Sequence, residues 1–278
     1  MSRTAVPASQ TFVHDGRRIA YRTFGSGPRV VVLTHGLLMD SRMYTHLAPT
    51  LAARGHRVVT VDMYGHGDSE QPHDMEAYSM PQFGADVIAL LDHLGVAQAV
   101  VGGTSLGANV ALEAVALAPS RVRALVLEMP VLENGLAAAG AVFVPLAFAI
   151  RLSKRSMGVV SWLCRKIPRT HWLVDIPIDF ARRDPGSSLA ILDGLTFGRT
   201  APPASQRRKI RQPTLVIGHP SDPIHPFSDA DRTAKELTGA RLVSAGSLYE
   251  WRFRPDRLDA VLAEFLDEVW AHPVAVAS

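Results

Sequence analysis

A five-residue segment between an apolar stretch and a helical pattern constrains the fold of this chain most. Residues 103–107 read Gly-Thr-Ser-Leu-Gly, after Ala-Val-Val at 99–101 and before a helix-like apolar run over 106–117. Glycines on both sides of Ser105 permit a sharp strand-to-helix turn that holds the serine hydroxyl above the edge of a sheet. The backbone N–H of Leu106 would then lie at a helix N-terminus, where negative charge is stabilised. The alternative interpretation is a glycine-rich loop with an incidental serine.

Three further apolar runs end in loops that carry polar side chains. The runs and their polar residues are 30–34 with His35, 58–61 with Asp62, and 213–217 with Asp222. We interpret His35 and Asp62 as residues that shape their turns by hydrogen bonding. Asp222 follows Ser105 in the chain, in the serine-then-acid order of one kind of catalytic triad.

Strand-like and helix-like segments alternate along the first half of the chain. The expected strands are 29–33, 57–61, 99–102 and 124–128, and the expected helices are 43–54, 80–94 and 106–118. Residues 11–21, with Asp-Gly at their centre, are typical of a β-hairpin. The alternation predicts a parallel sheet wrapped by helices, with ligands bound at the carboxyl ends of the strands. It stops after Pro130 and resumes at Pro213.

Together these motifs resemble the α/β-hydrolase superfamily, in particular its lipases and esterases with a helical cap. The resemblance extends from about residue 11 to about residue 270. It implies an α/β-hydrolase fold in which residues 1–133 and 206–278 form the core and residues 134–205 form an inserted cap. It also implies that Ser105 is the nucleophile, that the N–H groups of Leu37 and Leu106 are the oxyanion donors, and that Asp222 is the acid. Epoxide hydrolases and haloalkane dehalogenases of this fold place Asp where this chain has Ser105.

The chain departs from the superfamily pattern where the catalytic histidine is expected. Ser247 stands in the loop after the last expected strand, 241–243. A serine nucleophile needs a base, because its hydroxyl is weakly nucleophilic at neutral pH. His225 is one candidate, from the loop that carries Asp222, and its alternative interpretation is a solvated loop histidine. Glu250 and His171 are further candidates for the base.

Two readings remain in which no residue replaces the histidine. In one, the scaffold binds a ligand or directs a non-hydrolytic biosynthetic reaction. In the other, Ser247 is an engineered replacement of a catalytic histidine. Glu128, at the end of the strand after the nucleophile helix, is an alternative to Asp222 as the orienting acid.

The activity that the resemblance implies is that of a serine carboxylesterase with an acyl-enzyme on Ser105. The segment 134–205 is rich in aromatic and aliphatic residues, which favours a small hydrophobic ester with an apolar acyl or alkyl part. A thioesterase or a lactonase would use the same acyl-enzyme chemistry. No metal or organic cofactor is required.

Composition fits an enzyme without nucleic-acid or membrane-spanning functions. Net charge is +3, and the chain has one cysteine and no zinc-binding pattern. We expect a cytoplasmic protein, and the sequence leaves its oligomeric state open. The most apolar stretch, 136–150, is shorter than the roughly 20 residues of a spanning helix and contains Pro145, so we expect no membrane span. Nearby basic residues are expected to be solvated, with an anionic substrate or a membrane surface as the alternative; they are Arg151, Lys154, Arg155, Arg165, Lys166 and Arg169.

Overall fold

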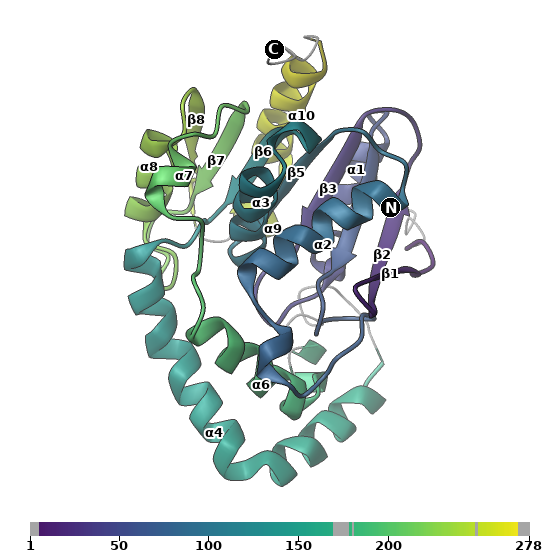
Figure 1. Ribbon diagram of the computed structural model, residues 1–278, viewed down its shortest axis with the longest axis vertical. Coiled ribbons are helices and arrows are strands. Elements are labelled where there is room, and N and C mark those ends of the chain that lie inside the picture. Colours follow the sequence, from purple (N-terminus) through teal and green to yellow (C-terminus); the bar gives the residue numbers. More distant parts are fainter. Residues whose placement is uncertain (1–5, 169–177, 180, 248–249, 272–278) are drawn as a thin grey trace.

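The computed structural model of the chain describes residues 6–168, 178–179, 181–247 and 250–271. Within these residues eight strands form one sheet in the order β1-β2-β4-β3-β5-β6-β7-β8 (Figure 1). The strands are β1 Gln10–His14, β2 Arg17–Phe24, β3 Val30–Thr34, β4 Arg57–Asp62, β5 Ala99–Thr104, β6 Val122–Glu128, β7 Thr214–Gly218 and β8 Ala240–Ser244. β1 and β2 pair antiparallel, as do β2 and β4, and all the other neighbours are parallel. The mostly parallel sheet predicted from the alternation is confirmed.

The hairpin of β1 and β2 turns at Asp15 and Gly16. Both residues have positive φ, 49° and 75°. Two consecutive left-handed residues match the twist of the flanking strands, which is why Asp-Gly predicts such a turn.

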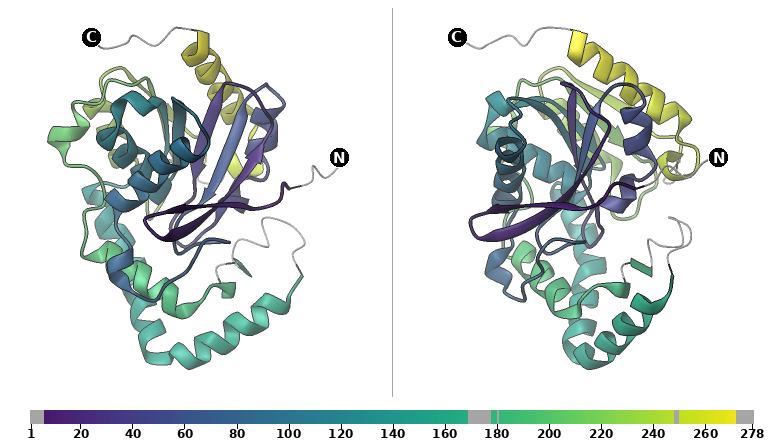
Figure 2. Two further views of the ribbon diagram at one scale, coloured as in Figure 1. Left: turned by 45° about the vertical axis from the view of Figure 1, so that its right-hand side comes forward. Right: turned by 90° about the vertical axis from the view of Figure 1, so that its right-hand side faces the viewer.

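Helices cover both faces of the sheet (Figures 1 and 2). α2 Met80–His93, α3 Leu106–Leu117 and α8 Phe227–Glu236 contribute to the apolar core on one face, and α1 Leu47–Ala52 and α10 Asp256–Ala271 to that on the other. Val101 of β5 points into the first core and Val100 into the second. Each face of the sheet therefore carries its own apolar core, because the strands are apolar on both faces, as parallel sheets require.

Shorter helical elements connect these layers. Short 3-10 turns are Ser41–Tyr44, Met75–Ala77 and Pro119–Arg121, and short helices are α7 Ala204–Arg207 and α9 Glu250–Phe253. The helix expected over 43–54 was too long, because the structure has the turn Ser41–Tyr44 followed by α1.

Between β6 and β7 the described residues form helices at one end of the molecule. α4 spans Glu133–Lys166, and α6 Pro185–Thr196 lies within its bend (Figures 1 and 2). The bend coincides with Ser153, whose φ of −132° and ψ of 34° are not helical. The helix runs through Pro145 and has 34 residues, so it is long and apolar enough to cross a membrane by length and composition alone. The prediction that the apolar stretch of this region is too short to span a membrane is therefore wrong.

Candidate active site

Ser105 sits in a strained turn between β5 and α3. Its φ is 56° and its ψ is −114°, a conformation that non-glycine residues rarely adopt. A Cβ at Gly107 would lie 1.9 Å from the carbonyl oxygen of Thr34, and one at Gly103 would lie 2.3 Å from the same oxygen. Only glycine lets the turn and the helix approach β3 this closely. The two glycines of the motif thus hold Ser105 at the carboxyl end of the sheet.

The Ser105 hydroxyl lies within hydrogen-bond distance of His225, and His225 lies within hydrogen-bond distance of Asp222. His225 Nε2 lies 2.8 Å from Ser105 Oγ, and His225 Nδ1 lies 2.9 Å from Asp222 Oδ2. Asp222 Oδ1 accepts the backbone N–H groups of Ile224 and His225, at 2.8 and 3.0 Å. Both the acid and the histidine therefore come from the loop after β7, three residues apart.

The charge of Asp222 fixes the tautomer of His225. Burial alone would raise the pKa of Asp222, but hydrogen bonds from His225 and from the backbone hold it below its usual value. An ionised Asp222 can only accept, so His225 Nδ1 carries the proton and donates it. In the neutral imidazole, Nε2 is then a free acceptor for the hydroxyl of Ser105.

His35 orients the peptide that precedes Leu37. The carbonyl of Gly36 accepts the N–H of Met39 at 3.1 Å, and His35 Nδ1 lies 2.8 Å from the same oxygen. The peptide is trans, so the N–H of Leu37 points to the opposite side. His35 Nε2 accepts the N–H of Met63 at 3.0 Å, and burial lowers the pKa of His35 to about 4. His35 is thus neutral and shapes its loop.

Leu37 and Leu106 are the two residues predicted to donate backbone N–H groups to an oxyanion. Leu106 is the first residue of α3, so its N–H lies at the N-terminus of that helix. Strand β3 pairs with β5 so that Thr34 lies beside Gly103, which brings the loops after both strands to one place. Asp62 lies on the adjacent strand β4 and accepts the N–H of Ser41 at 2.7 Å, so it holds its own turn.

Comparison with known proteins identifies the fold. A sequence model of the alpha/beta hydrolase fold matches residues 29–149. The chain has the α/β-hydrolase fold. A crystal structure of a hydrolase from Pseudomonas aeruginosa superposes with a TM-score of 0.74 at 24% identity, covering 93% of this chain and 98% of that one. The enol-lactonase from Burkholderia xenovorans gives a TM-score of 0.75 at 23% identity, covering 93% of this chain and 100% of that one.

Sequence similarity to curated proteins is confined to part of the chain. The bifunctional epoxide hydrolase 2 of Sus scrofa is 34% identical over 122 residues, which are 44% of this chain and 22% of that protein. The first such relatives are matched over about a fifth to a third of their own length. The sequence similarity to these proteins therefore covers less than half of this chain.

A second histidine–carboxylate pair lies beside the first at the same edge of the sheet. His219 follows β7, and its Nε2 lies 3.1 Å from Glu128 Oε1. Glu128 Oε2 accepts from Thr104 Oγ1 at 2.5 Å and from Arg252 at 2.8 Å. Burial raises the pKa of Glu128, but Arg252, His219 and Thr104 outweigh it and hold the pKa at about 2. His219 was not predicted as a site residue, although it directly follows a predicted strand, as the other polar residues at this edge do.

The loop that contains Ser247 contacts the second nitrogen of His219. The carbonyl oxygen of Ser247 lies 3.1 Å from His219 Nδ1, and the Ser247 side chain is exposed. Glu250 accepts from Arg257 at 2.6 Å and from the N–H of Gly246, and the hydrogen bond from Arg257 lowers the pKa of Glu250 to about 2. Its carboxylate is thus engaged with the start of the C-terminal helices. His171 and Arg169 lie outside the described residues.

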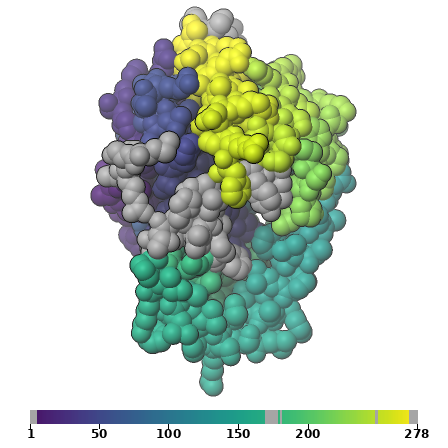
Figure 3. All heavy atoms as spheres, turned by 180° about the vertical axis from the view of Figure 1, so that it is seen from behind, coloured from purple at the N-terminus to yellow at the C-terminus, as the bar shows by residue number. Residues whose placement is uncertain are grey.

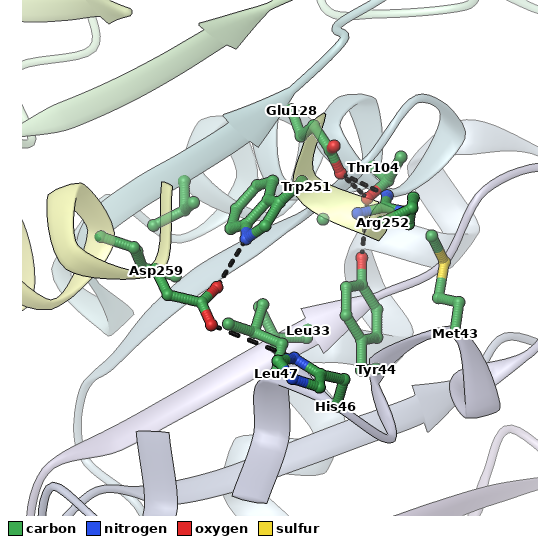
Figure 4. A pocket seen from close by; sticks show the side chains of 13 residues that line it. Leu33, Met43, Tyr44, His46, Leu47, Thr104, Glu128, Trp251, Arg252 and Asp259 are labelled. Carbon is green, nitrogen blue, oxygen red and sulfur yellow. Dashed lines mark hydrogen bonds and ion pairs between the residues drawn. The ribbon is translucent and has the colours of Figure 1, made fainter. Parts of the chain in front are cut away.

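A small cavity of about 30 Å³ lies beside the end of β5, next to the turn that carries Ser105 (Figure 4). Glu128, Thr104, Tyr44 and Arg252 form its polar side, and Tyr44 Oη lies 3.1 Å from Thr104 Oγ1. This volume holds no more than one or two water molecules. Ser105, Asp222 and His225 do not line this cavity. It therefore lies among the residues that hold the turn in place and is not a substrate pocket.

Proposed function

We propose that this chain is a serine hydrolase that cleaves carboxylic esters with an apolar acyl or alkyl group. The observation that carries the proposal is the contact of His225 Nε2 with Ser105 Oγ at 2.8 Å, with Asp222 on the other nitrogen. This arrangement supplies the base that the Ser247 position lacks. It also gives Asp222 the role of the orienting acid and leaves Glu128 a structural one.

In the first half-reaction Ser105 Oγ attacks the ester carbonyl carbon while its proton moves to His225 Nε2. Asp222 stabilises the resulting imidazolium through Nδ1. The imidazolium then gives its proton to the departing alcohol oxygen, which leaves an acyl-enzyme on Ser105. In the second half-reaction, water loses a proton to His225 and attacks the acyl carbon, and Ser105 recovers its proton as the acid leaves.

The negative oxygen of each tetrahedral intermediate would bind the N–H groups of Leu37 and Leu106. Each such donor contributes about 3 kcal/mol to the stabilisation of the transition state. The hydrogen bond from His35 to the carbonyl of Gly36 keeps the Leu37 N–H turned to the opposite side. His35 is therefore a positioning residue for the oxyanion site.

The helices between β6 and β7 support an apolar substrate. The side chains of four residues pack against the apolar core that α2, α3 and α8 cover; they are Phe143, Leu146 and Met157 of α4 and Leu189 of α6. We assign residues 134–205 as a cap over the carboxyl end of the sheet, where the substrate enters. The fold likeness to an enol-lactonase makes a lactone, a cyclic ester, the second candidate substrate class. An epoxide hydrolase is disfavoured, because enzymes of that type in this superfamily use Asp where Ser105 stands.

A fluorophosphonate probe with mass spectrometry tests the proposal. Attack by Ser105 Oγ displaces fluoride and adds the phosphonyl group, and peptide sequencing locates the adduct. We expect rapid single labelling of the wild type, none of Ser105→Ala and strongly slowed labelling of His225→Ala, with circular dichroism to show that each protein is folded. An unlabelled, folded wild type would favour the ligand-binding or non-hydrolytic alternative. A panel of p-nitrophenyl esters, lactones and thioesters then separates the substrate classes.

A further inference from the structure

Helix α4 carries an apolar stripe on the side that faces away from the protein. Val144, Phe148 and Leu152 follow each other at four-residue spacing and are 59%, 59% and 72% exposed. Residues at this spacing lie on one side of a helix. The opposite side is packed, since Ala147 and Ile150 are buried in the main core. A surface helix normally turns polar side chains outward, so α4 is apolar on both sides.

The apolar stripe continues beyond the bend at Ser153. Exposed apolar residues of this second arm are Val159, Val160, Trp162 and Leu163. Ser161 points the other way, where its hydroxyl donates to the carbonyl of Arg182 at 2.8 Å. Both arms of α4 therefore turn apolar side chains away from the protein, and together they form much of its lower end in Figure 3. Exposed apolar patches of this kind mark interaction surfaces.

After Glu133, its first residue, all the charges on α4 are positive. Between Asn134 and Lys166 the sequence contains no aspartate or glutamate, and its basic residues are Arg151, Lys154, Arg155, Arg165 and Lys166. Arg151 pairs with Asp193 of α6, and the ammonium of Lys166 lies 3.4 Å from the centre of the Trp162 ring. Lys154 and Arg155 are exposed at the bend.

We propose that the outer face of α4 docks on the surface of an anionic lipid bilayer, lying in the interface. Apolar side chains that enter the acyl boundary next to lysine and arginine that meet lipid phosphates are the features of interfacial helices. The charges argue against a second copy of the chain as the occupant, because two such faces would bring basic residues together, and the one acid of α4, Glu133 at its first position, already pairs with Arg232. The helix does not span the bilayer, since its inner side is packed against the protein and basic residues lie at its bend. The proposal is independent of the chemistry at Ser105.

Vesicle flotation of the full chain tests this docking. We expect binding to vesicles of phosphatidylcholine and phosphatidylglycerol in equal parts, at least about tenfold weaker binding to pure phosphatidylcholine, and weaker binding at high salt. The double variant Phe148→Gln/Leu152→Gln should lower the partition coefficient about tenfold or more. Lys154→Ala/Arg155→Ala should lower it by a similar factor on anionic vesicles only.

A matched control replaces an exposed apolar side chain elsewhere. Val13 of β1 is 69% exposed, and Val13→Gln should leave vesicle binding unchanged. Wild type that fails to float with anionic vesicles would overturn the proposal, as would equal binding to neutral ones. Light scattering tests the alternative that a second copy of the chain occupies this face. A wild-type dimer that Phe148→Gln/Leu152→Gln converts to a monomer would assign the face to that second copy instead.

Discussion

Two histidine–carboxylate pairs lie at the same edge of the sheet and differ in what the second imidazole nitrogen faces. In the pair of His225 and Asp222, the other nitrogen faces the Ser105 hydroxyl, which can donate. In the pair of His219 and Glu128, the other nitrogen faces the carbonyl oxygen of Ser247, which can only accept. A histidine between two acceptors must donate from both nitrogens, so it is an imidazolium.

Burial sharpens this difference. The side chain of His219 is 1% exposed and that of His225 is 15% exposed. Burial alone would lower the pKa of His219, but the hydrogen bond and charge of Glu128 raise it above the usual value. A buried imidazolium cannot take a proton, so this pair stabilises the fold. The third partner, and not the presence of a carboxylate, decides which histidine can act as a base.

Removal of each imidazole gives the largest expected contrast. His225→Ala should lower kcat/KM for a p-nitrophenyl ester on the order of 10⁵-fold, because Ser105 loses its base. His219→Gln should stay within about tenfold of wild type, because His219 takes no part in proton transfer. Initial rates below the unfolding temperature of both variants provide the measurement. Comparable losses in the two variants would break the distinction between the pairs.

Asp222→Asn tests whether the tautomer of His225 matters. The side-chain amide would donate to Nδ1, which moves the imidazole proton to Nε2 and removes the acceptor for Ser105. We expect kcat/KM to fall on the order of 10⁴-fold with little change in stability. Asp259→Asn is the control, because Asp259 accepts a hydrogen bond from Trp251 on the other face of the sheet. If Asp222→Asn keeps its activity, another acid orients the base.

Glu128→Gln tests the structural role of the second pair. Without the carboxylate, Arg252 and His219 lose their partner in a buried site, which costs about 3 kcal/mol of unfolding free energy. Urea unfolding of the variant and of wild type at one pH measures this loss. A change within about 0.5 kcal/mol would show that the network contributes little.

The same variant gives a pH signature. The folded-state pKa of Glu128 is about 2 against the usual 4.5, so its contribution is present above pH 4.5 and lost as pH falls toward 2. The pKa of His219 is raised above 6.5, so its contribution is present below pH 6.5 and lost as pH rises through the raised value. The stability difference between wild type and Glu128→Gln should therefore be largest between pH 4.5 and 6.5. A difference that grows below pH 4.5 would contradict this assignment.

The sequence was sufficient where the signals are local. The sharp turn at Ser105 and the Asp-Gly hairpin each depend on glycine within a few residues. The loop of Asp222 and His225 is also local, since one carboxylate oxygen accepts two backbone N–H groups while the other meets the ring three residues on. The sequence could not predict the contact between His225 Nε2 and Ser105 Oγ, because it depends on how β7 and β5 are placed in the sheet.

Long-range and solvent-dependent features were missed. Arg252 reaches Glu128 across 124 residues of chain, and no local pattern marks that pairing. A helix that continues through Pro145 was not predicted, because proline normally ends a helix. Pro145 is exposed and Ala141, whose carbonyl loses its partner there, is exposed as well, so water can replace the missing hydrogen bond.

Ser247→Ala gives the smallest expected effect and tests whether the usual histidine position keeps a function. Only the carbonyl of Ser247 contacts His219, and alanine retains that group, while the hydroxyl lies on an exposed side chain. We expect the unfolding free energy to change by no more than about 0.5 kcal/mol and ester hydrolysis to stay within about twofold of wild type. Urea unfolding and initial rates measure both quantities. A loss approaching that of His225→Ala would mean that the Ser247 hydroxyl acts on the substrate, so that both loops, and not only that of β7, supply the chemistry.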